Sequence, residues 1–319
     1  MSEAERDTEE WYRTFAEVEA RGQSDIYTRW ALGVAGDAGI RAMIERMPLQ
    51  KRQPNLVFAV SRLLGAPVAP WPEYREWLAA HLPEVAVEAR HRMTQTNEPR
   101  RCAALLPALA LLDGPLALVE VGTSAGLCLY PDRYSYSYNG ARLDPADGPS
   151  DVLLECETTG PVPVPGRMPE VAWRAGNDLY PLSVSDPHDM RWLETLVWPE
   201  QRERRERLRA AIGIARRNPP IVEAGDAVDG LAALAAQAPA GARLVVISSG
   251  VLVYLPRSER LRFAEVVRSI DADWVSLEGR GALPAVEAAL PERPGRFVLS
   301  LNEKPLAFAG AHGQALDWL

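Results

Sequence analysis

The residues of this chain with the clearest chemical meaning form one run, Glu120-Val121-Gly122-Thr123-Ser124-Ala125-Gly126, directly after an apolar stretch. Its small residues let the backbone turn sharply and approach a ligand closely. With a strand before it and a helix after it, the run is typical of a nucleotide-binding loop, because the free N–H groups of a helix start attract an anionic ligand group. The same letters also fit G-x-S-x-G, the elbow that presents a catalytic serine, here Ser124.

An acidic residue, Asp178, follows the apolar run at 171–176. A carboxylate at such a place can accept hydrogen bonds from both hydroxyls of a ribose. This interpretation requires an insertion between the loop at 120–126 and Asp178, because the two lie far apart in the sequence.

Two further apolar runs also end in small or acidic residues. Asp226 and Ala227 follow the first, where a carboxylate can accept from an adenine amino group and a backbone N–H can donate to a ring nitrogen. The alternative is that Asp226 caps a helix that begins at Ala227. Ser248 ends the second run and opens the segment SSGVLVYL, which suits an acceptor pocket or, alternatively, core packing.

The elements that must position these residues are predicted by the alternation of apolar runs and helical stretches after residue 115. This alternation favours βαβ units, a parallel sheet and hence an α/β fold. Ligands bind such a sheet at the carboxyl ends of its strands, where the strand order reverses. The predicted strands are 116–121, 171–176, 220–225, 243–248, 273–278 and 296–301, and the predicted helices are 191–217, 227–237, 257–269 and 282–290.

Two parts of this region depart from plain alternation. Residues 132–143 alternate like a strand and contain Asn139-Gly140, a strong hairpin signal, with 151–158 as a candidate partner strand. We therefore expect a β-hairpin insertion at about 130–170. At the other end, 297–308 and 315–319 are expected to form an antiparallel pair that closes the sheet.

Residues 1–113 are predicted to be helical, with no strand before residue 115. Apolar side chains recur at helical spacing in 9–20 and 56–64, and a helix is expected at 74–81. Another helix is expected within 94–115, with Asn97 as its N-cap. We expect 1–113 to form a separate domain, and the polar segment at 94–98 suggests that this domain serves as a lid over the site.

Taken together, the strand-end residues resemble class I S-adenosylmethionine-dependent methyltransferases, over about residues 114–319. The resemblance implies a Rossmann-like sheet, an S-adenosylmethionine cofactor and a small-molecule acceptor that the sequence does not identify. It also implies a cofactor site made of Glu120, Gly122, Thr123, Ser124, Gly126, Asp178, Asp226, Ala227 and Ser248.

Four phrases make the chain similar, over nearly its whole length, to an uncharacterised bacterial family (domain of unknown function twenty-three thirty-two). They are TQTNEPRRCAALLPALALL, LVEVGTSAGL, WPEQRERR and VVISSGVLVYL. No substrate follows from that likeness, so it supports the fold and not a reaction.

Methyl transfer forces no particular catalytic residue, because alignment and water exclusion supply much of the rate. Four residues are candidates for the acceptor side, and each has a structural alternative. The candidates are Glu98 (or a first-turn helix acid), Tyr254 (or a core residue), Glu278 (or a strand-end charge) and His312 (or a turn residue).

The rival interpretation is an α/β-hydrolase-type serine esterase with Ser124 as nucleophile, Asp271 or Asp273 as acid and His312 as base. The helical region upstream, the lack of an HGGG-like oxyanion segment and the presence of Glu120 weaken it. A third possibility is a nucleoside-binding protein without transfer chemistry, because fold does not imply function.

Composition excludes several classes of protein. The net charge of −8 argues against a general nucleic-acid or anionic-membrane binder. No apolar run reaches the ~20 residues of a membrane span, and the acidic N-terminus is not a secretory signal. Three separated cysteines and four histidines without metal-ligand spacing predict no metal site and fit a reducing cytoplasm. The sequence indicates no oligomeric state.

Overall fold

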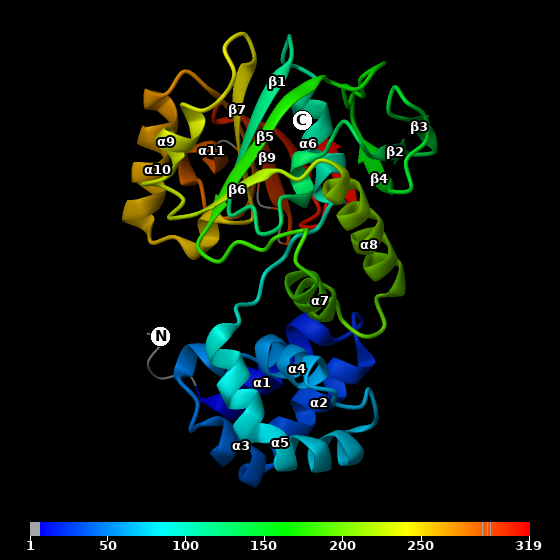
Figure 1. Cartoon of the computed structure of the whole chain (residues 1–319), viewed down its shortest axis with the longest axis vertical. Coiled ribbons are helices and arrows are strands. Elements are labelled where there is room, and N and C mark those ends of the chain that lie inside the picture. The colour runs from blue at the N-terminus through cyan, green and yellow to red at the C-terminus, as the bar shows by residue number, and fades with distance from the viewer. Residues whose placement is uncertain (1–6, 289, 292, 294) are drawn as a thin grey trace. The chain divides into compact units, whose positions relative to one another are not determined.

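A computed structural model of the chain describes residues 7–288, 290, 291, 293 and 295–319. The chain divides into two compact units (Figure 1). Unit 1 comprises Met1–Thr96 and Pro187–Glu206, and unit 2 comprises Asn97–Asp186 and Arg207–Leu319. Segment 101–109, which we expected in the N-terminal helical domain, thus packs in unit 2, while 187–206 packs in unit 1.

Unit 1 is helical, and no strand occurs among residues 7–115, as predicted. The helix expected at 74–81 is part of a longer one, α5. Capping residues mark the starts of several other helices. For example, the hydroxyl of Ser24 accepts a hydrogen bond from the Tyr27 amide at the start of α2. The elements are α1 (Thr8–Thr14), a π-helix (Phe15–Ala20), α2 (Asp25–Gly36), α3 (Ala38–Ile44), a 3-10 turn (Leu49–Lys51), α4 (Pro54–Leu63), α5 (Trp71–His91) and α7 (Pro187–Leu196).

Aromatic side chains build the core of unit 1. The rings of Trp30 and Tyr74 stack with centroids 3.6 Å apart, and Phe58 meets both edge-on. Trp198, from the segment that follows α7, contacts Phe15 and Tyr27. These contacts explain why 187–206 belongs to this unit.

Unit 2 is built on one eleven-stranded sheet of mostly parallel strands, in the order β3-β2-β4-β11-β10-β9-β8-β7-β1-β5-β6. The α/β prediction is therefore confirmed. Every strand predicted after residue 115 is present, and β1 has the predicted bounds. The strands are β1 (Leu116–Val121), β2 (Ser135–Tyr138), β3 (Ala141–Leu143), β4 (Leu153–Thr159), β5 (Val171–Asp178), β6 (Ile221–Ala224), β7 (Arg243–Ser249), β8 (Asp273–Gly279), β9 (Phe297–Leu301), β10 (Lys304–Ala309) and β11 (Ala315–Trp318).

Strand β1 lies between β5 and β7 and is parallel to both (Figure 1). After β1 the chain first forms the insertion strands β2, β3 and β4, then β5 and β6 on one side of β1, and then crosses to β7 and β8 on the other side. This reversal makes the carboxyl end of β1 the switch point at which such sheets bind ligands. At the far side, β8, β9, β10 and β11 run antiparallel in succession, so the expected antiparallel C-terminal pair is present.

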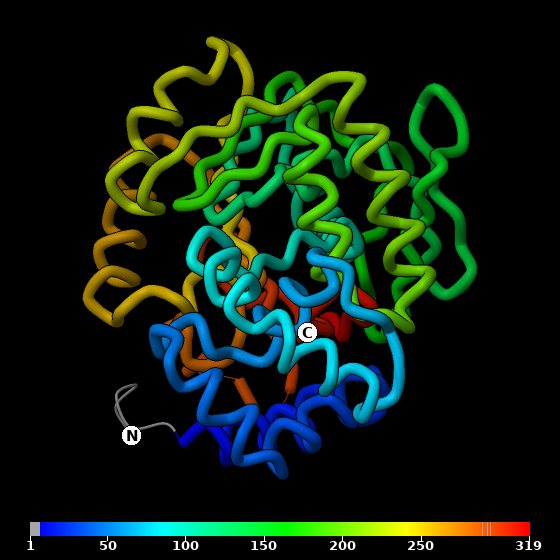
Figure 2. The backbone as a smooth tube through the Cα atoms, turned by 60° about the horizontal axis from the view of Figure 1, so that its bottom comes forward, coloured from blue at the N-terminus to red at the C-terminus, as the bar shows by residue number. Residues whose placement is uncertain are grey.

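The insertion at 130–170 contains the predicted hairpin, but its third strand pairs differently. Asn139 and Gly140 adopt positive φ angles of 48° and 87° and join β2 to β3 in an antiparallel hairpin. The expected partner at 151–158 is β4, which lies parallel to β2 and also parallel to β11. The insertion therefore extends the edge of the sheet, and β2 and β3 project outward as the green excursion in Figure 2.

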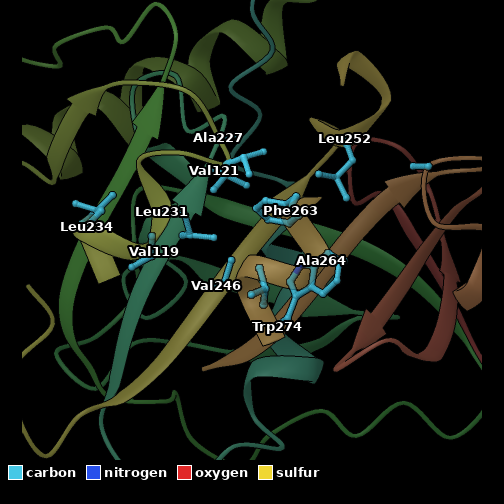
Figure 3. Packing of buried hydrophobic residues seen from close by; sticks show 14 residues of the cluster. Val119, Val121, Ala227, Leu231, Leu234, Val246, Leu252, Phe263, Ala264 and Trp274 are labelled. Carbon is cyan, nitrogen blue, oxygen red and sulfur yellow. The ribbon is translucent and has the colours of Figure 1, made fainter. Parts of the chain in front are cut away.

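Helices α9 (Leu231–Ala235) and α10 (Arg257–Ser269) pack on one face of the parallel strands. In Figure 3, Leu231 and Leu234 of α9 and Phe263 of α10 face Val119 and Val246 of the sheet. Residue 120 points to the opposite face, because side chains alternate along a strand.

The predicted helices of unit 2 differ from the observed ones mainly in length. α10 has the predicted bounds, whereas α9 and α11 (Pro284–Glu287) are shorter than expected. The long helix expected at 191–217 is two helices, α7 and α8 (Arg202–Arg217), separated around Pro199 because proline cannot continue a helix. Among the described residues, none of the helices combines the length and apolarity needed to cross a membrane.

Candidate functional site

The loop after β1 depends on its glycines. Gly122 and Gly126 have φ angles of 67° and 75°, where glycine is favoured. A Cβ on Gly122 would lie 2.4 Å from Cγ2 of Val251, and one on Gly126 would lie 2.7 Å from Cγ of Pro220. The amide of Gly122 donates to the carbonyl of Asn177 at 2.9 Å, so the loop folds against the end of β5.

The structure brings Asp178 to this loop. Its Oδ2 accepts a hydrogen bond from the Ser124 amide at 2.9 Å, and its Oδ1 accepts from the Tyr180 amide at 2.8 Å. Two of the predicted site residues therefore meet at the carboxyl ends of neighbouring strands.

No α-helix follows the loop, which corrects the expected strand–loop–helix arrangement. A single 3-10 turn, Leu127–Leu129, leads into the insertion. The Leu127 amide, expected to be free for a ligand, donates to Oδ1 of Asn97 at 3.1 Å. Nδ2 of Asn97 in turn donates to the carbonyl of Thr123 at 3.1 Å. Asn97 is thus a clamp on the loop and not the predicted N-cap, since α6 (Arg101–Leu109) begins only at Arg101.

Asp226 closes a turn at the end of β6. Its Oδ1 accepts from the amides of Val228 and Asp229, at 2.8 and 3.3 Å, and α9 begins only at Leu231. The alternative of a helix cap at Ala227 is therefore wrong in detail, because the capped segment is a turn. The carbonyl of Asp226 accepts from Nδ2 of Asn177 at 2.8 Å, which ties this turn to β5. The Ala227 side chain packs in the core cluster.

Core packing was an alternative for both Ser248 and Tyr254, and the structure supports it for Ser248 alone. Ser248 is fully buried, and its hydroxyl accepts from Nε1 of Trp274 at 3.1 Å, which matches the core alternative. Tyr254 is 81% exposed, so it is not a core residue.

Two buried carboxyl groups lie at the ends of β1 and β8. Glu120 accepts at Oε2 from the Thr123 hydroxyl at 2.7 Å, and burial raises its pKa to about 8. Glu278 accepts from the amides of Val251 and Leu252 at 3.3 and 3.2 Å, and burial raises its pKa to about 7. Carboxyl groups that titrate near neutral pH are typical of functional sites, because they can exchange protons under working conditions.

Arg101, at the start of α6, is a site residue that sequence reasoning missed. It is 8% exposed, and its positive charge lowers the pKa of both Glu120 and Glu278. Its guanidinium packs against Gly250, where a Cβ would lie 2.9 Å from Nη2. No sequence signal singled it out, because its neighbours come from strands and turns remote along the chain.

The remaining acceptor-side candidates have structural roles. Glu98 is buried and forms an ion pair with Arg207 at 3.1 Å. His312 is an exposed turn residue, and its amide donates to Oε1 of Gln314 at 3.1 Å. Its neighbour Ala311 supplies a carbonyl to Nε of Arg101 at 3.1 Å, so this turn lies beside the buried charges.

Two buried polar atoms near the site have no hydrogen-bond partner among the described residues, Oδ1 of Asn177 and Oγ of Ser249. Within the residues that the structure describes, no three His, Cys, Asp or Glu side chains are grouped so that they could hold a metal ion. Unit 2 also carries cavities of about 390 and 630 Å³, and no predicted site residue lines either one.

The family described as an uncharacterized protein conserved in bacteria (DUF2332) matches residues 9–318. The chain belongs to this family. No curated protein and no solved structure matches the chain. Membership therefore extends over both units and assigns no reaction.

Proposed function

We propose that unit 2 binds S-adenosylmethionine at the carboxyl ends of β1, β5 and β6 and transfers its methyl group to a small-molecule acceptor. The observation that carries the proposal is the hydrogen bond from the Ser124 amide to Asp178. It joins the glycine loop to the acid that would bind a ribose, at the switch point of a parallel sheet.

Four of the predicted residues have a definite part in this proposal. Asp178 accepts from the ribose hydroxyls, Gly122 and Gly126 permit close approach of the backbone, and the turn closed by Asp226 borders the base. S-adenosylmethionine supplies an activated methyl group on a sulfonium sulfur. The chain's own contribution is to align the acceptor and exclude water, which accounts for much of the rate in such displacements.

The protonation of Glu120 and Glu278 fits such a site. With a pKa of about 8, Glu120 is mostly protonated at pH 7 and can donate as well as accept a hydrogen bond. Glu278 has a pKa of about 7, which is suited to accepting a proton from a hydroxyl or amine acceptor. Its two bonds to backbone amides hold the segment after β7 in place.

One observation favours the esterase alternative. Ser124 has a φ of 54°, an uncommon value for a residue with a side chain and one that a nucleophile elbow also requires. Against it, a 3-10 turn and not an α-helix follows the loop. A fluorophosphonate probe that labels the wild-type protein at Ser124 would support the esterase, and no labelling would remove it.

Calorimetric titration with S-adenosylhomocysteine tests the proposal. We expect saturable binding to the wild-type protein and a loss of at least tenfold for Asp178→Ala, because charge-assisted hydrogen bonds contribute about 1.5–3 kcal/mol. Asp147→Ala is the matched control, since the side chain of Asp147 is 74% exposed and forms a surface ion pair with Arg133 at 3.5 Å. Absence of binding to the wild-type protein would contradict the proposal. Binding without any methyl transfer to candidate acceptors would favour the nucleoside-binding alternative.

A further inference from the structure

Arg101 is held in one position by the backbone. Its Nη1 donates to the carbonyl of Ser249 at 2.6 Å, and its Nε donates to the carbonyl of Ala311 at 3.1 Å. Because a guanidinium carries five N–H donors, these bonds use two and leave three. A fixed guanidinium with remaining donors is pre-organised to bind a planar anion such as a carboxylate.

Arg101 is linked to the loop of the proposed cofactor site through the end of β7. Ser249 ends β7, and β7 pairs with β1 up to Val121 and Ser248. Gly250 packs against the guanidinium, and Val251 packs against Gly122 in the loop after β1. Two consecutive residues, Gly250 and Val251, therefore connect the guanidinium to the glycine loop.

Among the described residues no carboxylate forms an ion pair with Arg101, which donates hydrogen bonds to two carbonyl oxygens. The carboxyl groups that influence it, Glu120 and Glu278, both titrate near neutral pH because they are buried. A second observation concerns the same spot. The hydroxyl of Ser249 is buried without a partner among the described residues. Buried charges and hydroxyls are costly unless they are paired.

We propose that Arg101, assisted by the hydroxyl of Ser249, binds a carboxylate group of the ligand. The inference rests on the proposed function of the same site. The carboxylate has two possible sources, the methionyl end of the cofactor or the acceptor molecule. In either case Arg101 determines specificity, because it selects for a carboxylate that an uncharged analogue lacks.

Two nucleosides distinguish these sources. S-adenosylhomocysteine carries the amino-acid carboxylate, whereas 5′-methylthioadenosine shares the adenosine and the thioether but has none. If the cofactor is the source, Arg101→Met weakens S-adenosylhomocysteine binding by roughly tenfold or more and leaves 5′-methylthioadenosine within twofold. If the acceptor is the source, both nucleosides bind the variant as they bind the wild-type protein. Benzoate and succinate then raise the melting temperature of the wild-type protein but not that of Arg101→Met.

The inference and the proposed function fail in different ways. A wild-type protein that binds neither nucleoside overturns the proposed function, while the benzoate and succinate measurements still test Arg101. Arg101→Met that binds both nucleosides and both carboxylates as the wild-type protein does overturns the inference. Should Arg101→Met not fold, Ser249→Ala and Arg101→Lys give the same test, with a severalfold loss expected for each. Full retention of affinity in both would overturn the inference as well.

Discussion

The amide of Ser124 donates a hydrogen bond to Oδ2 of Asp178 over 2.9 Å, although the two residues stand 54 positions apart in the chain. The whole insertion with β2, β3 and β4 lies between them. The bond fixes the loop after β1 against the end of β5, so the loop conformation and the acidic group depend on one another. Its loss should affect both stability and ligand binding.

Asp178→Asn tests both effects. Asparagine keeps one acceptor oxygen, so either the Ser124 or the Tyr180 amide loses its partner. We expect a loss of about 1–3 kcal/mol in the free energy of unfolding. Urea unfolding would measure this loss, and calorimetry would measure the accompanying loss of S-adenosylhomocysteine affinity. Unchanged stability would show that the bond does not hold the loop.

Gly122→Ala should destabilise the protein far more than Gly225→Ala. At Gly122 a Cβ meets Val251 at 2.4 Å and the backbone has a φ of 67°, whereas at Gly225 nothing lies within 4 Å. We expect a loss of about 1–3 kcal/mol for the first substitution. The second should change stability by less than about 1 kcal/mol. Thermal and urea unfolding of the two variants provide the measurement, and similar losses in both would contradict the proposed close approach.

Glu120→Gln should change how stability depends on pH. In the unfolded chain this carboxyl loses its proton near its ordinary pKa of 4.5, but in the folded protein only near 8. Between these values the folded state binds more protons, so the group destabilises the wild-type protein progressively as pH rises. The stability of Glu120→Gln relative to wild type should therefore increase from pH 5 to pH 8, by at most about 1.4 kcal/mol per pH unit. A difference that is constant over this range would argue against the raised pKa.

The Arg174–Asp132 pair should be a strong local determinant of stability. Nη2 of Arg174 donates to both carboxylate oxygens at 2.5 and 2.6 Å, and both side chains are largely buried. The guanidinium also lies over the ring of Tyr130, 5.0 Å from its centroid. Arg174→Met leaves the buried carboxylate with Arg133 alone, whose Nε lies 3.1 Å from Oδ2, and should cost about 2–4 kcal/mol. Adding Asp132→Asn should recover part of that loss, and a double variant as unstable as the single one would show that packing dominates.

Local patterns were sufficient to predict much of unit 2. The apolar run 116–121 is β1 without change, and Asn139-Gly140 forms the predicted hairpin turn. These features depend on neighbouring residues, since strand alternation and turn chemistry act over a few positions.

Pairings between distant segments could not be predicted in the same way. The segment 151–158 has the composition of a strand, but nothing in it specifies a parallel partner on each side, β2 and β11. Asn97 is a residue type that often caps helices. Its side-chain amide instead donates to the carbonyl of Thr123 and accepts from the backbone amide of Leu127. Residue type indicates what a side chain can bond, and tertiary packing decides which partner it meets.

The sequence by itself determined the strands, the glycine loop and the acidic residues at the strand ends, because each is encoded by short-range periodicity and small-residue spacing. Only the tertiary structure decided that Asp178 meets Ser124, that 187–206 packs with the N-terminal helices, and that Arg101 lies beside Glu120 and Glu278. Burial is the physical reason for the last of these. A carboxyl group acquires a pKa near neutrality only when packing removes it from water, and no pattern of neighbours along the chain contains that information.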